Sequence, residues 1–99
     1  MFIRDVSAIP LPGKQAELVA VVKEAVAYLD QRWPAASPRT VTADLIDGRV
    51  HFLTQRDSLD AHEAAVAERQ ADAGFRAFAG RMLALVVPGS VRWPYSRVC

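Results

Sequence analysis

The feature that most constrains this chain is the residue pattern of positions 41–54. Apolar and polar side chains alternate up to Leu45, Asp47-Gly48 provides a turn dipeptide, and a second β-rich run returns from Val50 to Thr54. Alternation with a period of two is typical of a strand with one buried face, and Asp-Gly is a favoured two-residue hairpin turn. The sequence therefore predicts a β-hairpin that turns at residues 47 and 48.

A two-residue turn would also fix which residues face each other across the hairpin. Asp44 is then expected opposite His51. One face is predicted to pack under helices and carries Val41, Ala43, Leu45, Val50, Phe52 and Thr54. The other face mixes polar and apolar groups, which suits a dimer seam or a ligand chamber, and carries Thr42, Asp44, Ile46, His51, Leu53 and Gln55.

A strand and a helix are predicted before the hairpin. Residues 2–9 are rich in β-branched and aromatic residues and end at Pro10-Leu11-Pro12-Gly13, where the prolines lack amide donors and the glycine permits a sharp turn. From Lys14 to Arg32 or Trp33 the apolar spacing becomes helical, and Pro34 disfavours further helix. The apolar stripe of this helix consists of Leu18, Val21, Val22, Ala25, Val26 and Leu29.

The C-terminal part predicts a second helix, a break and a last strand. Asp57-Ser58 offers N-cap residues, positions 71–74 are expected to break or bend the helix, and a third helical stripe runs from Phe75 to Val86. Residues 91–98 are predicted to return as a strand, in which Pro94 indicates an edge position or a bulge. The resulting order, β-α-β-β-α-β, predicts an α+β fold of the ferredoxin-like type.

Size and composition narrow the expected assembly and partners. Ninety-nine residues fit one domain, 1–99, with a thin core. Because 52% of the residues are hydrophobic, we expect part of this surface to be buried against a second copy, as a homodimer. The net charge of +1 is spread along the chain without a basic stripe, so we expect no nucleic-acid partner.

Compartment and metal chemistry are constrained by what the sequence contains. The single cysteine, Cys99, cannot form an intramolecular disulfide, which suits a reducing compartment, and no apolar run approaches the ~20 residues of a membrane span. We therefore expect a cytoplasmic protein without a membrane partner. Two isolated histidines without H-x-H or H-x-x-x-H spacing predict no metal site, and no serine lies in a nucleophile-elbow context.

Three runs of residues together carry a family resemblance. They are Pro12-Gly13 before the first helix, Arg56-Asp57-Ser58-Leu59-Asp60-Ala61-His62-Glu63, and the stretch from Ala73-Gly74-Phe75-Arg76-Ala77-Phe78 to Val86-Val87-Pro88-Gly89-Ser90. In their common order they resemble the NIPSNAP-like branch of the dimeric α+β-barrel superfamily, which also includes antibiotic-biosynthesis monooxygenase-like domains. The resemblance covers nearly the whole chain.

This resemblance implies an antiparallel sheet with helices on one face and a second copy paired through the other. Relatives use the space between sheet and partner for small, often aromatic or polycyclic molecules. Some oxygenate such molecules without metal or organic cofactor, others isomerise or cyclise them, and others degrade haem. The chain contains no asparagine, so an Asn-dependent oxygenase or haem-degrading site has no obvious counterpart here. The missing asparagine weakens the case for an enzyme, and no cofactor is expected.

Two sets of candidate site residues emerge, each with a structural alternative. A carboxylate at Asp44 facing His51 would fix the imidazole tautomer for proton transfer, or the pair could simply satisfy two polar groups at an interface. Trp93, Tyr95 and Arg97 share one face of the last strand and could stack on a flat ligand and hold an anion, or they could form ordinary interface.

The sequence leaves two functional hypotheses. The first is a homodimeric domain that holds a small, largely apolar or aromatic molecule between sheet and helices, as an accessory cofactor-independent oxygenase, isomerase or cyclase. The second is a non-catalytic dimerisation or interaction module whose open sheet face is filled by contacts between the two copies. An enclosed chamber would favour the first hypothesis, and a completely packed seam the second.

Overall fold

The computed structural model describes residues 2–33, 39–44, 46–56, 59–93 and 95–97. Its elements follow the predicted order, with the second helical segment divided in two. They are β1 (Phe2–Ala8), α1 (Gln15–Arg32), β2 (Thr40–Ala43), β3 (Val50–Arg56), α2 (Leu59–Ala71), α3 (Ala73–Leu83) and β4 (Tyr95–Arg97).

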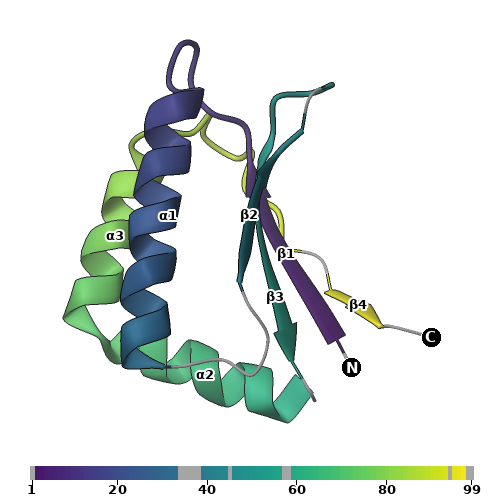
Figure 1. The fold of residues 1–99 in the computed structure, drawn as a ribbon, viewed down its shortest axis with the longest axis vertical. Coiled ribbons are helices and arrows are strands. Elements are labelled where there is room, and N and C mark those ends of the chain that lie inside the picture. The colour runs from purple at the N-terminus through teal and green to yellow at the C-terminus, as the bar shows by residue number, and fades with distance from the viewer. Residues whose placement is uncertain (1, 34–38, 45, 57–58, 94, 98–99) are drawn as a thin grey trace.

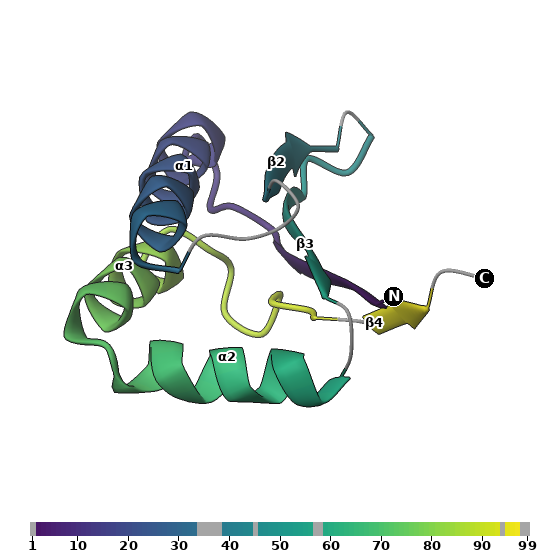
Figure 2. The same cartoon turned by 60° about the horizontal axis from the view of Figure 1, so that its bottom comes forward.

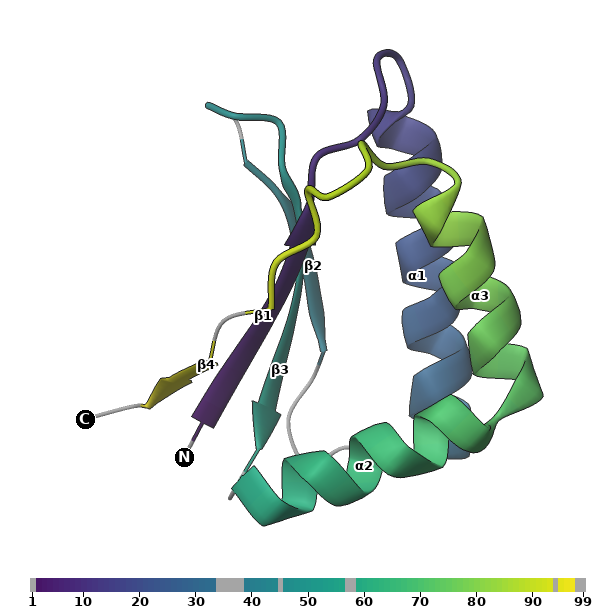
Figure 3. The same cartoon turned by 180° about the vertical axis from the view of Figure 1, so that it is seen from behind.

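The strands form one antiparallel sheet in the order β2-β3-β1-β4, which confirms the ferredoxin-like α+β prediction. Helices α1 and α3 lie side by side against one face of this sheet (Figure 1). Helix α2 crosses one end of the two layers on its way from β3 to α3 (Figure 2). None of the described helices lies on the opposite face of the sheet, as the view from behind also shows (Figure 3).

The core is built where the stripe of α1 meets β3 and the segment after α3. Leu18 and Val22 of α1 pack with Val50 of β3 and with Val86, all four at most 7% exposed. Leu29, one turn before the end of α1, is 1% exposed. The helical periodicity thus identified both the element and its buried face, because the residues at i, i+3, i+4 and i+7 are those that the sheet covers.

The hairpin forms, but its register differs from the predicted one by two residues. Ala43 pairs with Val50 and Thr42 with His51, so Asp44 does not stand opposite His51. Asp44 instead closes a longer loop: its amide N donates to the Arg49 carbonyl at 2.8 Å. A shift of two residues leaves the side-chain faces unchanged, because strand side chains alternate with a period of two. Val50 and Thr54 are accordingly buried under the helices, as predicted.

The side chain of Asp44 explains why this loop is longer than two residues. Its Oδ1 accepts hydrogen bonds from the amides of Ile46 at 2.7 Å and Asp47 at 3.2 Å. Such a side-chain turn replaces ladder hydrogen bonds near the tip of the hairpin. Gly48 then takes a φ of +73°, which only glycine adopts without strain. The Asp47-Gly48 signal placed the turn correctly but misjudged its length.

The break between α2 and α3 is held against α1 by one carboxylate. Asp72 caps α3 through the amide of Phe75, accepts from the Tyr28 hydroxyl and pairs with Arg32 at 3.1 Å. A Cβ at Gly74 would overlap the ring of Tyr28, so this close approach requires glycine. The predicted break at residues 71–74 is therefore a junction that ties α3 to α1.

The last strand is described in part. Tyr95–Arg97 is a strand and an isolated bridge joins Arg92 to Ser7, while Pro94 and Val98 of the predicted strand lie outside the described residues. The bridge and β4 share one register against β1, and β4 lies at the edge of the sheet. Pro94, for which an edge position or a bulge was predicted, lies outside the described residues. Among the described residues, the helices are too short or too polar to cross a membrane.

Candidate functional site

A cavity of about 250 Å³ lies between the sheet and the helices. It is bordered by α1, α3, β1, β3 and the end of α2, and its wall is almost entirely apolar. Side chains that define it include Leu18, Val22, Phe52, Phe75, Ala79 and Met82. Ligand pockets in proteins are typically concave and mostly apolar, and this cavity is smaller than the usual ~300–1,000 Å³ of drug-sized pockets. A small ring system is of the right size.

Helix α3 shows that this space is not a fully packed core. Its apolar residues at helical spacing, Phe75, Phe78 and Met82, are each only partly buried, and none of its residues is fully buried. The neighbouring α1, by contrast, buries five residues of its stripe. Phe75 and Met82 border the cavity, so the apolar face of α3 is directed at space that protein atoms leave unfilled.

Among the described residues that border the cavity, the charged ones are two arginines. Arg4 comes from the middle of β1, and Arg69 from the last turn of α2, where it is 4% exposed. Arg4 reaches the cavity because the alternation of β1 directs Arg4, Val6 and Ala8 toward the helices. The sequence left the facing of this strand undetermined, so Arg4 was not among the predicted site residues, and Arg69 of α2 was not among them either.

The same alternation places Asp5 on the open face of the sheet, beside His51. The His51 Nδ1 lies 2.9 Å from Asp5 Oδ1 and 3.1 Å from Oδ2, and the side chains are 21% and 32% exposed. The carboxylate that bonds the imidazole therefore comes from β1 rather than from Asp44. This arrangement orients the ring and leaves Nε2 as the nitrogen outside the pair.

Asp44 is close to His51 without being its hydrogen-bond partner. The amide of Ile46, then that of Asp47, and more weakly the nearby His51, hold the pKa of the Asp44 carboxyl below its ordinary value. Asp44 is thus a charged group that fixes the hairpin loop. Proton transfer between His51 and Asp44 was predicted from the expected register. The two residues lie near each other, but no hydrogen bond joins them.

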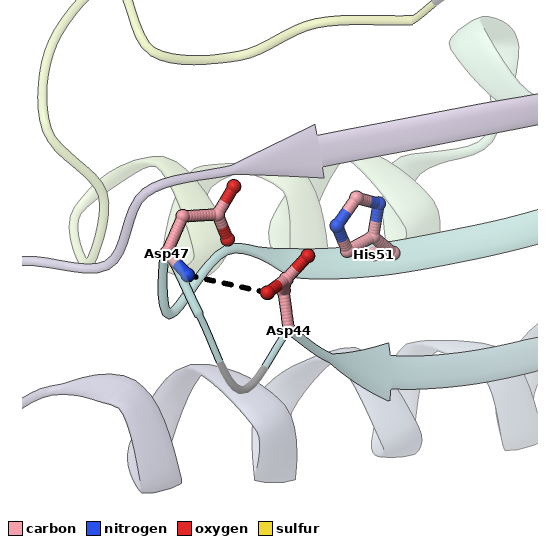
Figure 4. Close-up of side chains that lie close together, drawn as sticks. All are labelled: Asp44, Asp47 and His51. Atoms are coloured by element: carbon pink, nitrogen blue, oxygen red, sulfur yellow. Dashed lines mark hydrogen bonds between the residues drawn. The ribbon is translucent and has the colours of Figure 1, made fainter.

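The hairpin loop also gathers three residues that could ligate a metal ion. One ligand atom each of Asp44, Asp47 and His51 lies within 4.8 Å of the others (Figure 4). Asp44 Oδ1 already accepts two backbone amides and Asp47 Oδ1 accepts the Arg49 amide at 2.8 Å. The role that the structure demonstrates for both carboxylates is therefore to shape the loop. Sequence spacing missed this grouping because a turn, not a motif, assembles it.

Arg49, next to this loop, is a buried cation that ties three segments together. Its Nη1 donates to the Ser90 carbonyl at 2.8 Å and to Ser7 Oγ at 3.2 Å, and the residue is 8% exposed. It joins β1 and the segment before β4 to the start of β3. This network is structural and was not anticipated from the sequence.

The predicted aromatic row of the last strand is only partly described. Trp93 is 56% exposed and does not border the cavity. The backbone of Tyr95 pairs with Arg4 and that of Arg97 with Phe2, but their side chains lie outside the described part of the structure. Neither His51 nor Asp44 lines the cavity, so the predicted polar pair and the apolar site lie on opposite sides of the sheet.

Comparison with solved structures supports the fold from end to end. A NIPSNAP domain protein from Burkholderia xenovorans matches with a TM-score of 0.78 at 13% identity, covering 100% of this chain and 95% of the other. A NIPSNAP family protein from Agrobacterium tumefaciens matches with a TM-score of 0.77 at 19% identity, covering 97% and 90%. A putative antibiotic biosynthesis monooxygenase from Caulobacter crescentus matches with a TM-score of 0.77 at 18% identity, covering 99% and 89%.

These likenesses confirm that the chain has the fold of NIPSNAP and antibiotic biosynthesis monooxygenase-like proteins, as the resemblance of its motifs implied. At such low sequence identities these similarities establish the fold and say nothing about the activity of this chain. No protein-family model matches the chain, and no curated protein is significantly similar to it.

Proposed function

We propose that the chain is a small-molecule-binding domain whose ligand, a small apolar or aromatic molecule, occupies the cavity between the sheet and helices α1 and α3. The observation that carries this proposal is the apolar face of α3, which borders a cavity of about 250 Å³ instead of a packed core. Filling such a space with larger side chains would stabilise a chain this small by several kcal/mol, on the order of its whole margin of stability. A ligand-binding function would explain why the cavity is not filled by larger side chains.

The fold neighbours support an extension of this proposal toward catalysis. Several carry the printed name antibiotic biosynthesis monooxygenase. By analogy of fold, the bound molecule would be oxygenated, isomerised or cyclised in the cavity without a resident cofactor. Chemistry is tested by liquid chromatography and mass spectrometry of a bound phenol after incubation in air, where added oxygen mass identifies oxygenation and a new retention time at unchanged mass identifies isomerisation or cyclisation.

The open sheet face supports a second part of the proposal, a homodimer. The face without helices carries Asp5, His51 and the half-buried Leu53, a mixture of polar and apolar groups that suits a partner surface. A second copy covering it would place the Asp5 and His51 pair at the seam. His51 and Asp44 are then candidates for proton transfer at that interface, separate from the cavity ligand.

The binding proposal is tested with a panel of small ring molecules: naphthol, naphthamide and naphthoate. Isothermal titration calorimetry is expected to detect at least one of them at one molecule per chain. Ala79→Phe places a ring in the cavity and is expected to abolish this binding while leaving the protein folded.

The matched control is Ala77→Phe, two residues away on the exposed side of α3. It adds the same ring outside the cavity and is expected to bind the panel like wild type. Absence of binding across the whole panel, or equal loss in both variants, contradicts the proposed site. A packed dimer without ligand binding would then favour the interaction-module hypothesis.

A further inference from the structure

We propose that the ligand of the cavity is an elongated apolar molecule, about 12 Å long, that lies lengthwise between the sheet and helices α1 and α3. This inference rests on the proposed binding function and names the shape class of the ligand. It follows from the extent of the cavity, which borders α1, α3 and β1 along most of their length.

Four successive turns of α1 border the cavity. Leu18, Val22, Ala25 and Leu29 follow one another at intervals of three or four residues on one side of this helix, and all four line the cavity. An α-helix rises about 1.5 Å per residue, so the first and last of these positions are about 16 Å apart along the helix axis. A cavity at a single level of α1 would border only one or two of these turns. The space therefore runs along the helix.

Helix α3 forms a second wall that runs beside the first. It lies antiparallel to α1, because Arg81 near its end pairs with Glu24 at 2.9 Å. At the other end, Asp72 pairs with Arg32 at 3.1 Å. Each turn of α3 from Phe75 to Leu83 contributes a residue to the cavity wall, over about 12 Å of helix axis. The two helices thus border the same space over a similar length.

The cavity also reaches parts of the chain that α3 holds apart. Arg69, in the last turn of α2, borders it before α3 begins, and Val86 borders it after α3 ends. Figures 1 and 3 show α2 and the segment after α3 at opposite ends of the helical layer. On the sheet side, Arg4 and Ala8 both line the cavity, about 13 Å apart along β1 at roughly 3.3 Å per residue. All the walls therefore give a similar length.

The volume of the cavity makes this long space narrow. Spread over about 12 Å, a volume of about 250 Å³ corresponds to a mean cross-section of about 20 Å². A protein pocket typically covers most of the surface of its ligand, so its shape selects the shape of the molecule it holds. The molecule that fills this space is long in one direction, as an unbranched chain or a row of rings.

The experiment compares isomers that differ in shape but not in composition. In 4-phenylphenol the two rings lie in line, whereas 2-phenylphenol is compact. Both are neutral at pH 7, because a phenol ionises near pH 10. Calorimetry is expected to show that the 4-isomer binds about tenfold or more tightly, which corresponds to roughly 55 Å² of additional apolar surface buried. A second pair, 1-nonanol and the compact 2,6-dimethyl-4-heptanol, tests unbranched chains in the same way.

Substitutions at the two ends of the cavity test its length. Phe75→Trp enlarges a side chain near α2, and Ala8→Phe adds a ring at the opposite end. Each is expected to reduce the preference for 4-phenylphenol by about tenfold, because either change shortens the space. Naphthol is a shorter molecule and is expected to bind both variants like wild type, which shows that the cavity is intact.

The matched control is Phe78→Trp, which enlarges a side chain of α3 that does not border the cavity. It is expected to leave the preference for 4-phenylphenol unchanged. If either end variant fails to fold, the wild-type ratio of the two isomers decides the question.

The outcomes separate this inference from the function on which it rests. Preference for the straight isomer in either pair supports an elongated ligand, and the pair that discriminates identifies a row of rings or a chain. If naphthol binds but both pairs bind equally, or the compact isomers bind more tightly, the elongated class is wrong while the binding site stands. If neither naphthol nor any of these probes binds, the proposed function fails and the inference with it.

Discussion

The two faces of the sheet are made by the same strands but carry opposite chemistry. Toward the helices, the strands present apolar side chains and Arg4 around a cavity; toward the open side, they present Asp5 and His51. Neighbouring residues of β1 supply the cation of one face and the carboxylate of the other. Successive side chains of a strand point to opposite faces of the sheet, and the helices cover only one of these faces. The position of a residue along the strand therefore decides whether it faces the cavity or the open side.

The largest effect is expected from the face under the helices. Leu29→Ala removes a side chain that is 1% exposed and borders the cavity, which should lower the free energy of unfolding by about 2–5 kcal/mol. Urea unfolding followed by circular dichroism measures this change. The matched variant Leu83→Ala, where the leucine is 63% exposed, should stay within about 0.5 kcal/mol of wild type. Equal costs would mean that Leu29 of α1 is no better packed than the exposed Leu83 at the end of α3.

The open face is expected to respond in assembly rather than in folding. Leu53→Glu places a charge on that face beside the Asp5 and His51 pair, so the proposed homodimer should dissociate about tenfold or more readily. Light scattering coupled to size-exclusion chromatography measures the mass over a dilution series. Gln55→Glu adds the same charge nearer the end of β3, at an exposed position, and should have less effect. A wild-type chain that is monomeric at every concentration contradicts the proposed seam.

The next largest effect is expected at the junction of α2 and α3, which should make the free energy of unfolding depend on pH. The Tyr28 hydroxyl, followed by the Phe75 amide, holds the pKa of Asp72 below its ordinary value, and the same hydrogen bond raises the pKa of Tyr28. Because the folded state favours ionised Asp72, this stabilisation is present above the unfolded pKa, about 4, and is lost as the pH falls through the folded pKa. For Tyr28 the sign is reversed, and stabilisation is lost as the pH rises beyond about 10.

Thermal unfolding between pH 2.5 and 7 tests the acid side of this dependence, where the wild-type midpoint should decline most steeply below about pH 4. Asp72→Asn keeps a side-chain oxygen for the N-cap but cannot ionise, so its acid decline should be shallower and its neutral midpoint lower by on the order of 5 °C. A decline identical to that of wild type would mean that other carboxylates govern the acid limb.

The comparison of the faces also shows what sequence could and could not predict. The hairpin, its buried face and the stripe of α1 follow from periodicity, which depends only on neighbouring residues. The register was wrong because the Asp44 side chain binds the Ile46 and Asp47 amides and lengthens the loop, an interaction that the Asp-Gly signal does not encode. A ligand space between sheet and helices was expected, but its lining by α3 was not predicted, because the stripe of α3 has the same spacing whether it meets side chains or open space.

The smallest effect should be that of the open face on the cavity ligand. His51 bonds Asp5 on the far side of the sheet and does not border the cavity, so His51→Ala should change naphthoate affinity less than about twofold. Calorimetry on this variant and on Ala79→Phe, under the same conditions, compares the two faces directly. A tenfold loss in His51→Ala with the fold retained would mean that the faces are coupled through β1. Arg4 and Asp5, which point to opposite faces of β1, would then belong to one functional site instead of two separate ones.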